Sequence, residues 1–245
     1  MTSSDHPVRR IIEASVAAVL LVAAVPAIVL AAVASAVTYR AWPFFVQDRV
    51  GRGGRTFRLV KVRSLPPCID AYADKYAIRA QSLPRHMVRM RTLHLDELPQ
   101  LWHVVAGDMA FVGPRPEMPN LHAQLPARFA AERVSVTPGL TGLWQISPHC
   151  NLLIGDRTEY DRLYIEHRNA SFDLWILWRT VVKMTTGRTT HLFQVPQRAI
   201  TPAPAVRFEI VDVTIAGVRH TLQAPPQAAV AGAVAGPAEA LTLAD

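Results

Sequence analysis

Two adjacent carboxylates, Asp96 and Glu97, precede an apolar run that ends at Gly107. Pro99 is tolerated in the first turn of a helix, where the first backbone N–H groups have no intrahelical partners. Gly107 stands where a helix C-cap would fall, so we predict a helix from about Asp96 to Ala106. The positive N-terminal end of such a helix favours ionised carboxylates and can accept a phosphate nearby.

A stiff arginine follows this run. Arg115 lies between Pro114 and Pro116, whose fixed φ angles restrict the orientations of its guanidinium. A carboxylate nucleophile, an anion-binding helix end and a stiff arginine together indicate phosphoryl chemistry. Taken singly, each piece has a plainer interpretation: Asp96 as a helix N-cap, and the segment Gly-Pro-Arg-Pro as a turn.

A second group of cations lies on a predicted β-hairpin. Strand-like runs flank Gly53 and Gly54, which favour a hairpin turn. In the second run Lys61 and Arg63 share one face, because side chains alternate along a strand. The two cations can therefore clamp a diphosphate, or they can simply form a solvated basic face. The glycines match neither the P-loop nor the dinucleotide-binding pattern.

The first element that must position these residues is an apolar segment. Residues 14–39 contain no charged side chain and are long enough to cross about 30 Å of hydrocarbon as a helix. Pro26 would kink that helix. Arginines occur both in the polar N-terminus, residues 1–13, and just after the segment, so the positive-inside rule gives no orientation. An ordinary single-pass anchor and a re-entrant helix bent at Pro26 both remain open.

Size and charge are compatible with one domain and a membrane element. The chain has 245 residues, half of them hydrophobic, and a net charge of +7. Such a basic chain suits an anionic partner, which can be nucleic acid, a membrane surface or a phosphorylated substrate. Cys68 and Cys150 lack metal-ligand spacing, and we expect free thiols in a reducing compartment.

The second half of the chain contains further expected elements. We predict an amphipathic helix around 121–133, helices at 159–167 and 172–184, and a small β-hairpin within 206–222. The tryptophans and cations of the helix at 172–184 fit either a helix lying in lipid headgroups or a core helix. Residues 223–245 are rich in Ala, Pro and Gly, and we expect them to be disordered.

Several of these motifs together resemble the bacterial sugar transferases, the small monotopic phosphoglycosyl transferases that act as polyprenyl-phosphate hexose-1-phosphate transferases. The matching segments are Lys61–Ser64, Leu95–Gln100, Gly107–Met109, Val112–Pro116, Thr137–Ile146 and Tyr160–Glu166. They occur in the family's order within residues 8–190. The resemblance implies an α+β fold with an N-terminal re-entrant (or single-pass) membrane helix, residues 14–39. A small mixed α/β catalytic domain with interfacial amphipathic helices follows at 40–190, and residues 191–245 form an extension.

The resemblance also implies an activity. A sugar 1-phosphate passes from a UDP-sugar to polyprenyl phosphate through a phosphosugar on Asp96, with release of UMP, and this step initiates surface polysaccharide or glycoconjugate synthesis. Asp96 is then the nucleophile, Glu97 the Mg²⁺ ligand with Asp96 beside it, and Lys61, Arg63 and Arg115 bind phosphate. The implied location is the bacterial inner membrane, with the catalytic domain on the cytoplasmic face. Homodimer formation is left open.

The sequence departs from the family pattern in three places. Val25 replaces a common serine before Pro26, residues 66–92 differ although Arg79, Arg89 and Arg91 supply positive charge, and residues 148–151 replace Gly-Arg. A catalytically degenerate member and a membrane-anchored basic binding protein are therefore alternatives. Nucleic acid is not the expected partner, because its binding gives no reason for paired carboxylates in a basic domain.

Overall fold

The structure is a computed structural model that describes residues 7–69, 83–200, 209–215 and 218–224. Contacts divide the chain into two units, Met1–Thr201 and Pro202–Asp245. The helices of the first unit are α1 (Pro7–Tyr39), α3 (Arg85–Thr92), α4 (Leu101–Ala106), α5 (Pro119–His122), α6 (Ala127–Val134), α7 (Leu143–Ile146), α8 (Glu159–His167) and α9 (Ala170–Thr186). Its 3-10 helices are η2 (Arg52–Gly54), η3 (Leu95–Gln100), η4 (Ile154–Asp156), η5 (Leu192–Gln194) and η6 (Gln197–Ala199). Its strands are β1 (Phe44–Val50), β2 (Thr56–Val62), β3 (Ala110–Val112) and β4 (Gly139–Thr141).

The second unit contains the antiparallel hairpin of β5 (Glu209–Ile215) and β6 (Val218–Ala224), which confirms the hairpin predicted within 206–222. Most of the predicted disordered tail, residues 225–245, lies outside the described residues, as does Arg79.

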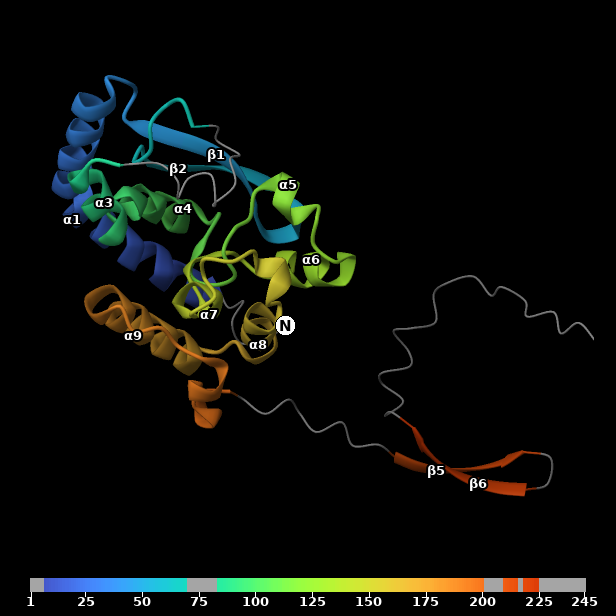
Figure 1. The fold of residues 1–245 in the computed structure, drawn as a ribbon. Helices are drawn as coiled ribbons and strands as arrows, with labels where there is room; N and C mark the ends of the chain where they lie inside the picture. The colour runs from blue at the N-terminus through green and yellow to red at the C-terminus, as the bar shows by residue number, and fades with distance from the viewer. Residues whose placement is uncertain (1–6, 70–82, 201–208, 216–217, 225–245) are drawn as a thin grey trace, which may run out of the picture. The chain divides into compact units, whose positions relative to one another are not determined.

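Two small sheets organise the described residues of the first unit (Figure 1). The predicted hairpin is confirmed: β1 and β2 pair antiparallel, with Phe44 opposite Val62, and η2 forms the turn. The other sheet pairs β3 and β4 in parallel. A Cβ on Gly139 would overlap the backbone of Gly113, so the two segments approach as closely as glycine allows. The main core cluster, with Trp144 and Phe129, packs beside this sheet and holds α7, α8 and α9 together.

The predicted helix from Asp96 to Ala106 is wrong in its first half. Residues Leu95–Gln100 form the 3-10 helix η3, and only Leu101–Ala106 form the α-helix α4. Pro99 lacks the N–H that an α-helical turn would use, and the chain winds more tightly there. The acid pair therefore lies on a 3-10 turn ahead of α4, and neither carboxylate occupies an α-helix N-terminus. Gly107 ends α4 with a φ of 97°, as predicted for a C-cap.

The later helices follow the predicted pattern with one correction. The helix expected around 121–133 is two short helices, α5 and α6, because Pro126 stands between them as the residue preceding α6. Helices α8 and α9 confirm the predictions at 159–167 and 172–184. The side chain of Asn169 caps α9 by accepting a hydrogen bond from the backbone N–H of Phe172 at 3.0 Å.

The apolar segment forms one continuous helix, α1, whose ribbon changes direction part-way along (Figure 1). Pro26 lies inside it, and its most apolar window is long and apolar enough to cross a membrane by length and composition, with 11% of that window buried. Both ends of α1 contact the rest of the first unit. Near the start, Arg10 donates to the carbonyl oxygens of Val104 and Val105 at 2.5 and 2.8 Å. Near the end, the Ser35 hydroxyl donates to the Arg63 carbonyl oxygen at 2.6 Å.

Candidate active site

Asp96 is buried, with 4% of its surface exposed, and is held from one side only. The Ser64 hydroxyl donates to Asp96 Oδ2 at 2.8 Å, and Arg91 in turn donates to the Ser64 oxygen at 2.9 Å. Asp96 Oδ1 is buried without a hydrogen-bond partner among the described residues. The carboxylate is therefore fixed through one oxygen while the other is left for a ligand or a reaction.

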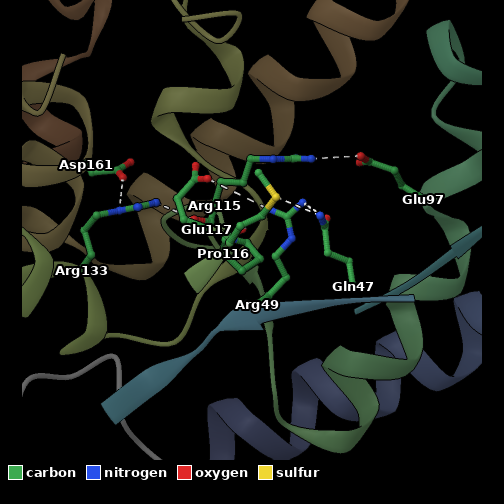
Figure 2. A network of polar contacts seen from close by, with 9 residues as sticks. Gln47, Arg49, Glu97, Arg115, Pro116, Glu117, Arg133 and Asp161 are labelled. Carbon is green, nitrogen blue, oxygen red and sulfur yellow. Dashed lines mark hydrogen bonds and ion pairs between the residues drawn. The ribbon is translucent and has the colours of Figure 1, made fainter. Parts of the chain in front are cut away.

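Glu97 lies beside a guanidinium group and an imidazole ring, those of Arg115 and His94. Arg115 donates to Glu97 Oε1 at 3.3 Å (Figure 2), and the His94 ring lies 3.7 Å from Oε2. His94 has a φ of 54°, in the left-handed region, so the backbone turns sharply just before the acid pair. Burial alone would raise the pKa of Glu97, but Arg115, His94 and Lys61 together lower that pKa well below its usual range. These neighbours therefore favour the ionised form of Glu97.

The two neighbouring carboxylates have opposite pKa shifts. Burial and the charge of Glu97 raise the pKa of Asp96, and Ser64, Lys61 and Arg91 partly offset this. When the surroundings shift the pKa values of two neighbouring carboxyl groups in opposite directions, the two groups can take different roles in one site. Asp96 keeps one buried oxygen without a hydrogen-bond partner among the described residues, and the neighbours of Glu97 favour its charged form.

Lys61 is close enough to the acid pair to interact electrostatically with Glu97 and Asp96, and its role in binding phosphate stays a prediction. Burial lowers the pKa of its ammonium group to about 8, against the attraction of Glu97. Arg63 has other contacts: its guanidinium donates to the carbonyl oxygens of Trp42 and Phe44 at 2.9 and 3.4 Å. Its role in binding phosphate stays a prediction. Arg91, whose role the sequence left unassigned, is the cation that the fold brings to the Ser64–Asp96 pair.

Two buried arginines hold the loop that carries Arg115 (Figure 2). Arg133 donates to the Arg115 carbonyl oxygen at 2.5 Å and forms an ion pair with Asp161, Nε to Oδ2, at 2.9 Å. Arg49 donates to the next carbonyl oxygen along, that of Pro116, at 3.0 Å. The flanking prolines predict a stiff loop around Arg115. The two arginines add hydrogen bonds to the carbonyl oxygens of two successive loop residues, Arg115 and Pro116. Sequence reasoning missed both arginines, because each lies far along the chain from its partner.

The comparisons with known proteins bear on these residues. Residues 4–187, most of the chain, match the family described as "Bacterial sugar transferase". The chain belongs to this family. The acid pair, the Lys61 strand and the Arg115 loop all lie within the matched region.

Individual relatives of this bacterial sugar transferase carry more specific names. It is 34% identical over 161 residues to a "UDP-galactose-lipid carrier transferase" of Erwinia amylovora, a match covering 57% of this chain and 32% of that protein. It is 32% identical over 164 residues to "Exopolysaccharide production protein ExoY" of Rhizobium meliloti, covering 60% and 72%. It is 33% identical over 186 residues to a "UDP-glucose:undecaprenyl-phosphate glucose-1-phosphate transferase" of Caulobacter vibrioides, covering 73% and 70%.

The acid pair can accept Mg²⁺. No group of three or more His, Cys, Asp or Glu side chains converges in the part of the chain that the structure describes. Mg²⁺ does not require one, since it is commonly held by one or two carboxylates together with substrate phosphates and water. Asp96 Oδ1 is a buried acceptor without a partner among the described residues, and Glu97 stays ionised beside it. The donor set therefore fits Mg²⁺ bound together with a phosphorylated substrate.

Proposed function

We propose that this bacterial sugar transferase moves a sugar 1-phosphate from a UDP-sugar to polyprenyl phosphate. The observation that carries the proposal is the buried Asp96, with one oxygen anchored and the other free, next to the ionised Glu97 and the cations Lys61, Arg91 and Arg115. The printed names of the Caulobacter and Erwinia relatives describe reactions of this type.

The reaction we infer has two steps. Asp96 Oδ1 attacks the β-phosphorus of the UDP-sugar, and the bond from that phosphorus to the bridging oxygen breaks. UMP leaves with the bridging oxygen, and the phosphosugar remains on the carboxylate. An oxygen of the polyprenyl phosphate then attacks the same phosphorus and releases the Asp96 carboxylate. The product is a polyprenyl diphosphate sugar.

The side chains around the acid pair have the charges that this reaction needs. Ser64 holds Asp96 Oδ2, so the attacking oxygen is oriented before the substrate arrives. Lys61 and Arg115 offset the negative charge of the diphosphate, which otherwise repels a carboxylate. Glu97, with Asp96 beside it, would hold Mg²⁺, and the bound ion would neutralise phosphoryl oxygens.

We further propose that α1 is a re-entrant helix. It enters the membrane from the cytoplasmic side and returns to the same side. Support comes from the contacts of Arg10 and Ser35, which tie the two ends of α1 to one catalytic unit. A helix that spans the bilayer puts its ends on opposite faces, about 30 Å of hydrocarbon apart. In a protein whose free thiols are removed by Cys68→Ser and Cys150→Ser, a cysteine introduced at each end should react with a membrane-impermeant maleimide in inside-out vesicles only. Reaction of one end from each face contradicts this topology.

The activity is tested by UMP release from a panel of UDP-sugars with Mg²⁺ and polyprenyl phosphate. The wild-type protein should release UMP, and Asp96→Asn should release none, while the matched control Asp156→Asn, at an exposed carboxylate outside the site, should behave as wild type. Without acceptor, the wild type should gain the mass of one sugar phosphate, and Asp96→Asn should not. Equal release by the wild type and Asp96→Asn refutes the nucleophile, and no release with any sugar refutes the activity.

A further inference from the structure

A buried histidine outside the acid pair joins helix α4 to the strand that carries Lys61. His103, on α4, is 4% exposed, and its ring packs against that of Phe57 on β2, with the centroids 5.2 Å apart. The backbone N–H of Val60, also on β2, donates to His103 Nε2 at 3.2 Å. Because this N–H points to α4, it lies on the edge of β2 that β1 does not pair. His103 therefore satisfies a backbone donor that the β1–β2 ladder leaves unpaired.

The hydrogen bonds of the ring determine which of its nitrogens carries the proton. A backbone N–H can only donate, so His103 Nε2 must accept through a bare lone pair. The proton of the neutral ring is then on Nδ1, which lies 3.0 Å from Asp108 Oδ2 and donates to it. The backbone N–H groups of Gly107 and Met109, on either side of Asp108, both donate to the His103 carbonyl oxygen at 3.0 Å. Asp108 is thus held where it favours the one tautomer that can accept from β2.

We propose that His103 is a positioning residue for Lys61. Its Nδ1-protonated ring fixes the backbone of β2 at Val60, one residue before the lysine. The effect on the reaction rests on the proposed function, in which Lys61 contacts the diphosphate of the substrate. Phe45, opposite Lys61 on β1, supports the lysine side chain, whose ammonium group lies 5.1 Å from the ring centroid. Phe45 thus orients the side chain of Lys61, and His103 fixes the backbone that carries it.

Apolar packing by itself does not fix β2 along its own direction. Leu59 of β2 and Val104 of α4 belong to one core cluster, but contacts of this kind are non-directional. The hydrogen bond from Val60 is directional and ends on one acceptor atom at one height along the strand. A shift of β2 past α4 would break this bond and move Lys61 relative to the carboxylates whose charges act on it. Such a shift would weaken the contact with the diphosphate.

The first test locates the proton. Full-length protein with ¹⁵N-labelled histidine and valine is studied by NMR in neutral detergent at about pH 8, above the ordinary titration range of histidine. His103→Gln identifies the ring signals of His103 by removing them. Nδ1 should carry the proton, and Nε2 should show a coupling to the backbone nitrogen of Val60 across the hydrogen bond. A proton on Nε2 overturns the proposal, and no turnover is involved.

The second test is isothermal titration of the same protein with UDP and Mg²⁺, which measures binding of the diphosphate. His103→Leu removes the acceptor and should weaken UDP binding about tenfold. His103→Gln, whose Oε1 can accept from Val60, should stay within about threefold of wild type. His191→Leu makes the same change at an exposed position and is the matched control, which should bind UDP as wild type does. In a protein that carries Lys61→Gln, His103→Leu should weaken binding no further, because the side chain that it positions is gone.

Thermal unfolding of each variant shows that it is folded, and Asp108→Ala replaces His103→Leu if the latter does not fold. The Asp108 side chain is 42% exposed, so the fold tolerates its loss while the ring loses the partner of Nδ1. This variant should weaken UDP binding about threefold, and not at all beside Lys61→Gln. Equal losses with and without Lys61, or a loss for His103→Gln as large as for His103→Leu, overturn the proposal. Absence of UDP binding by the wild type contradicts the proposed function instead, and the proton on Nδ1 is then unaffected.

Discussion

The buried ion pair between Arg133 and Asp161 leads to the sharpest prediction. Asp161→Asn keeps the shape of the side chain but removes the charge that faces Arg133 at 2.9 Å. The two side chains are 4% and 2% exposed, so water cannot replace the lost carboxylate. Arg133 is also the donor to the Arg115 carbonyl oxygen. The substitution should therefore reduce both stability and activity.

The size of each effect follows from these contacts. Removing one partner of a buried ion pair costs about 3–5 kcal/mol. Asparagine can still accept the hydrogen bond of Arg133, so we expect a loss of about 3 kcal/mol, or a Tm lower by about 6–12 °C in a chain of this size. A shift of the Arg115 guanidinium by about 1 Å should lower kcat/KM for UMP release about 100-fold.

The assay combines thermal unfolding with UMP release at a temperature where the variant is fully folded. Glu159→Gln, on the same helix but 43% exposed, is the matched control and should change Tm by about 2 °C or less. A double-mutant cycle with Arg115→Ala separates the two roles of Asp161. If Asp161 acts through Arg115, adding Asp161→Asn to Arg115→Ala should lower kcat/KM no further.

Two results would refute this reasoning. Asp161→Asn with a lowered Tm but wild-type kcat/KM would mean that the Arg133–Asp161 pair stabilises the fold without positioning Arg115. Additive losses in the cycle would mean that Asp161 influences the reaction by another route.

Three further predictions concern other parts of the molecule. Burial lowers the pKa of Lys61 to about 8, so the phosphate contact proposed for its ammonium group should be lost as the pH rises through about 8. A pH–rate profile should fall there, and Lys61→Arg should move the fall to higher pH. Gly139→Ala should destabilise the protein by about 3 kcal/mol in thermal unfolding, because the new Cβ overlaps the backbone of Gly113. Arg10→Gln should lower stability by about 1.5–3 kcal/mol, since two charged hydrogen bonds to α4 are lost.

The sequence by itself determined the local elements and the family. Gly53 and Gly54 set the hairpin turn, Asn169 the start of α9 and Gly107 the end of α4, because each acts through its own backbone or its nearest neighbours. The acid pair and the proline-flanked Arg115 indicated phosphoryl chemistry without any tertiary contact. Two local expectations failed, both at prolines. The turn that holds Asp96 is a 3-10 helix around Pro99, and Pro126 separates α5 from α6 where a single helix was expected.

Only the tertiary structure decided which cations surround the acid pair and what holds them. The contact between Ser64 and Asp96 joins residues 32 apart in the chain, and that between Arg133 and Arg115 joins residues 18 apart. Spacing along the chain carries no signal for such contacts, since they depend on how separate elements pack. Periodicity puts Lys61 and Arg63 on one face, and both lie over the Phe45 ring, at 5.1 and 5.8 Å from its centroid. Packing decides the rest: Lys61 interacts with the charge of Glu97, whereas Arg63, just after β2, also donates to backbone carbonyl oxygens.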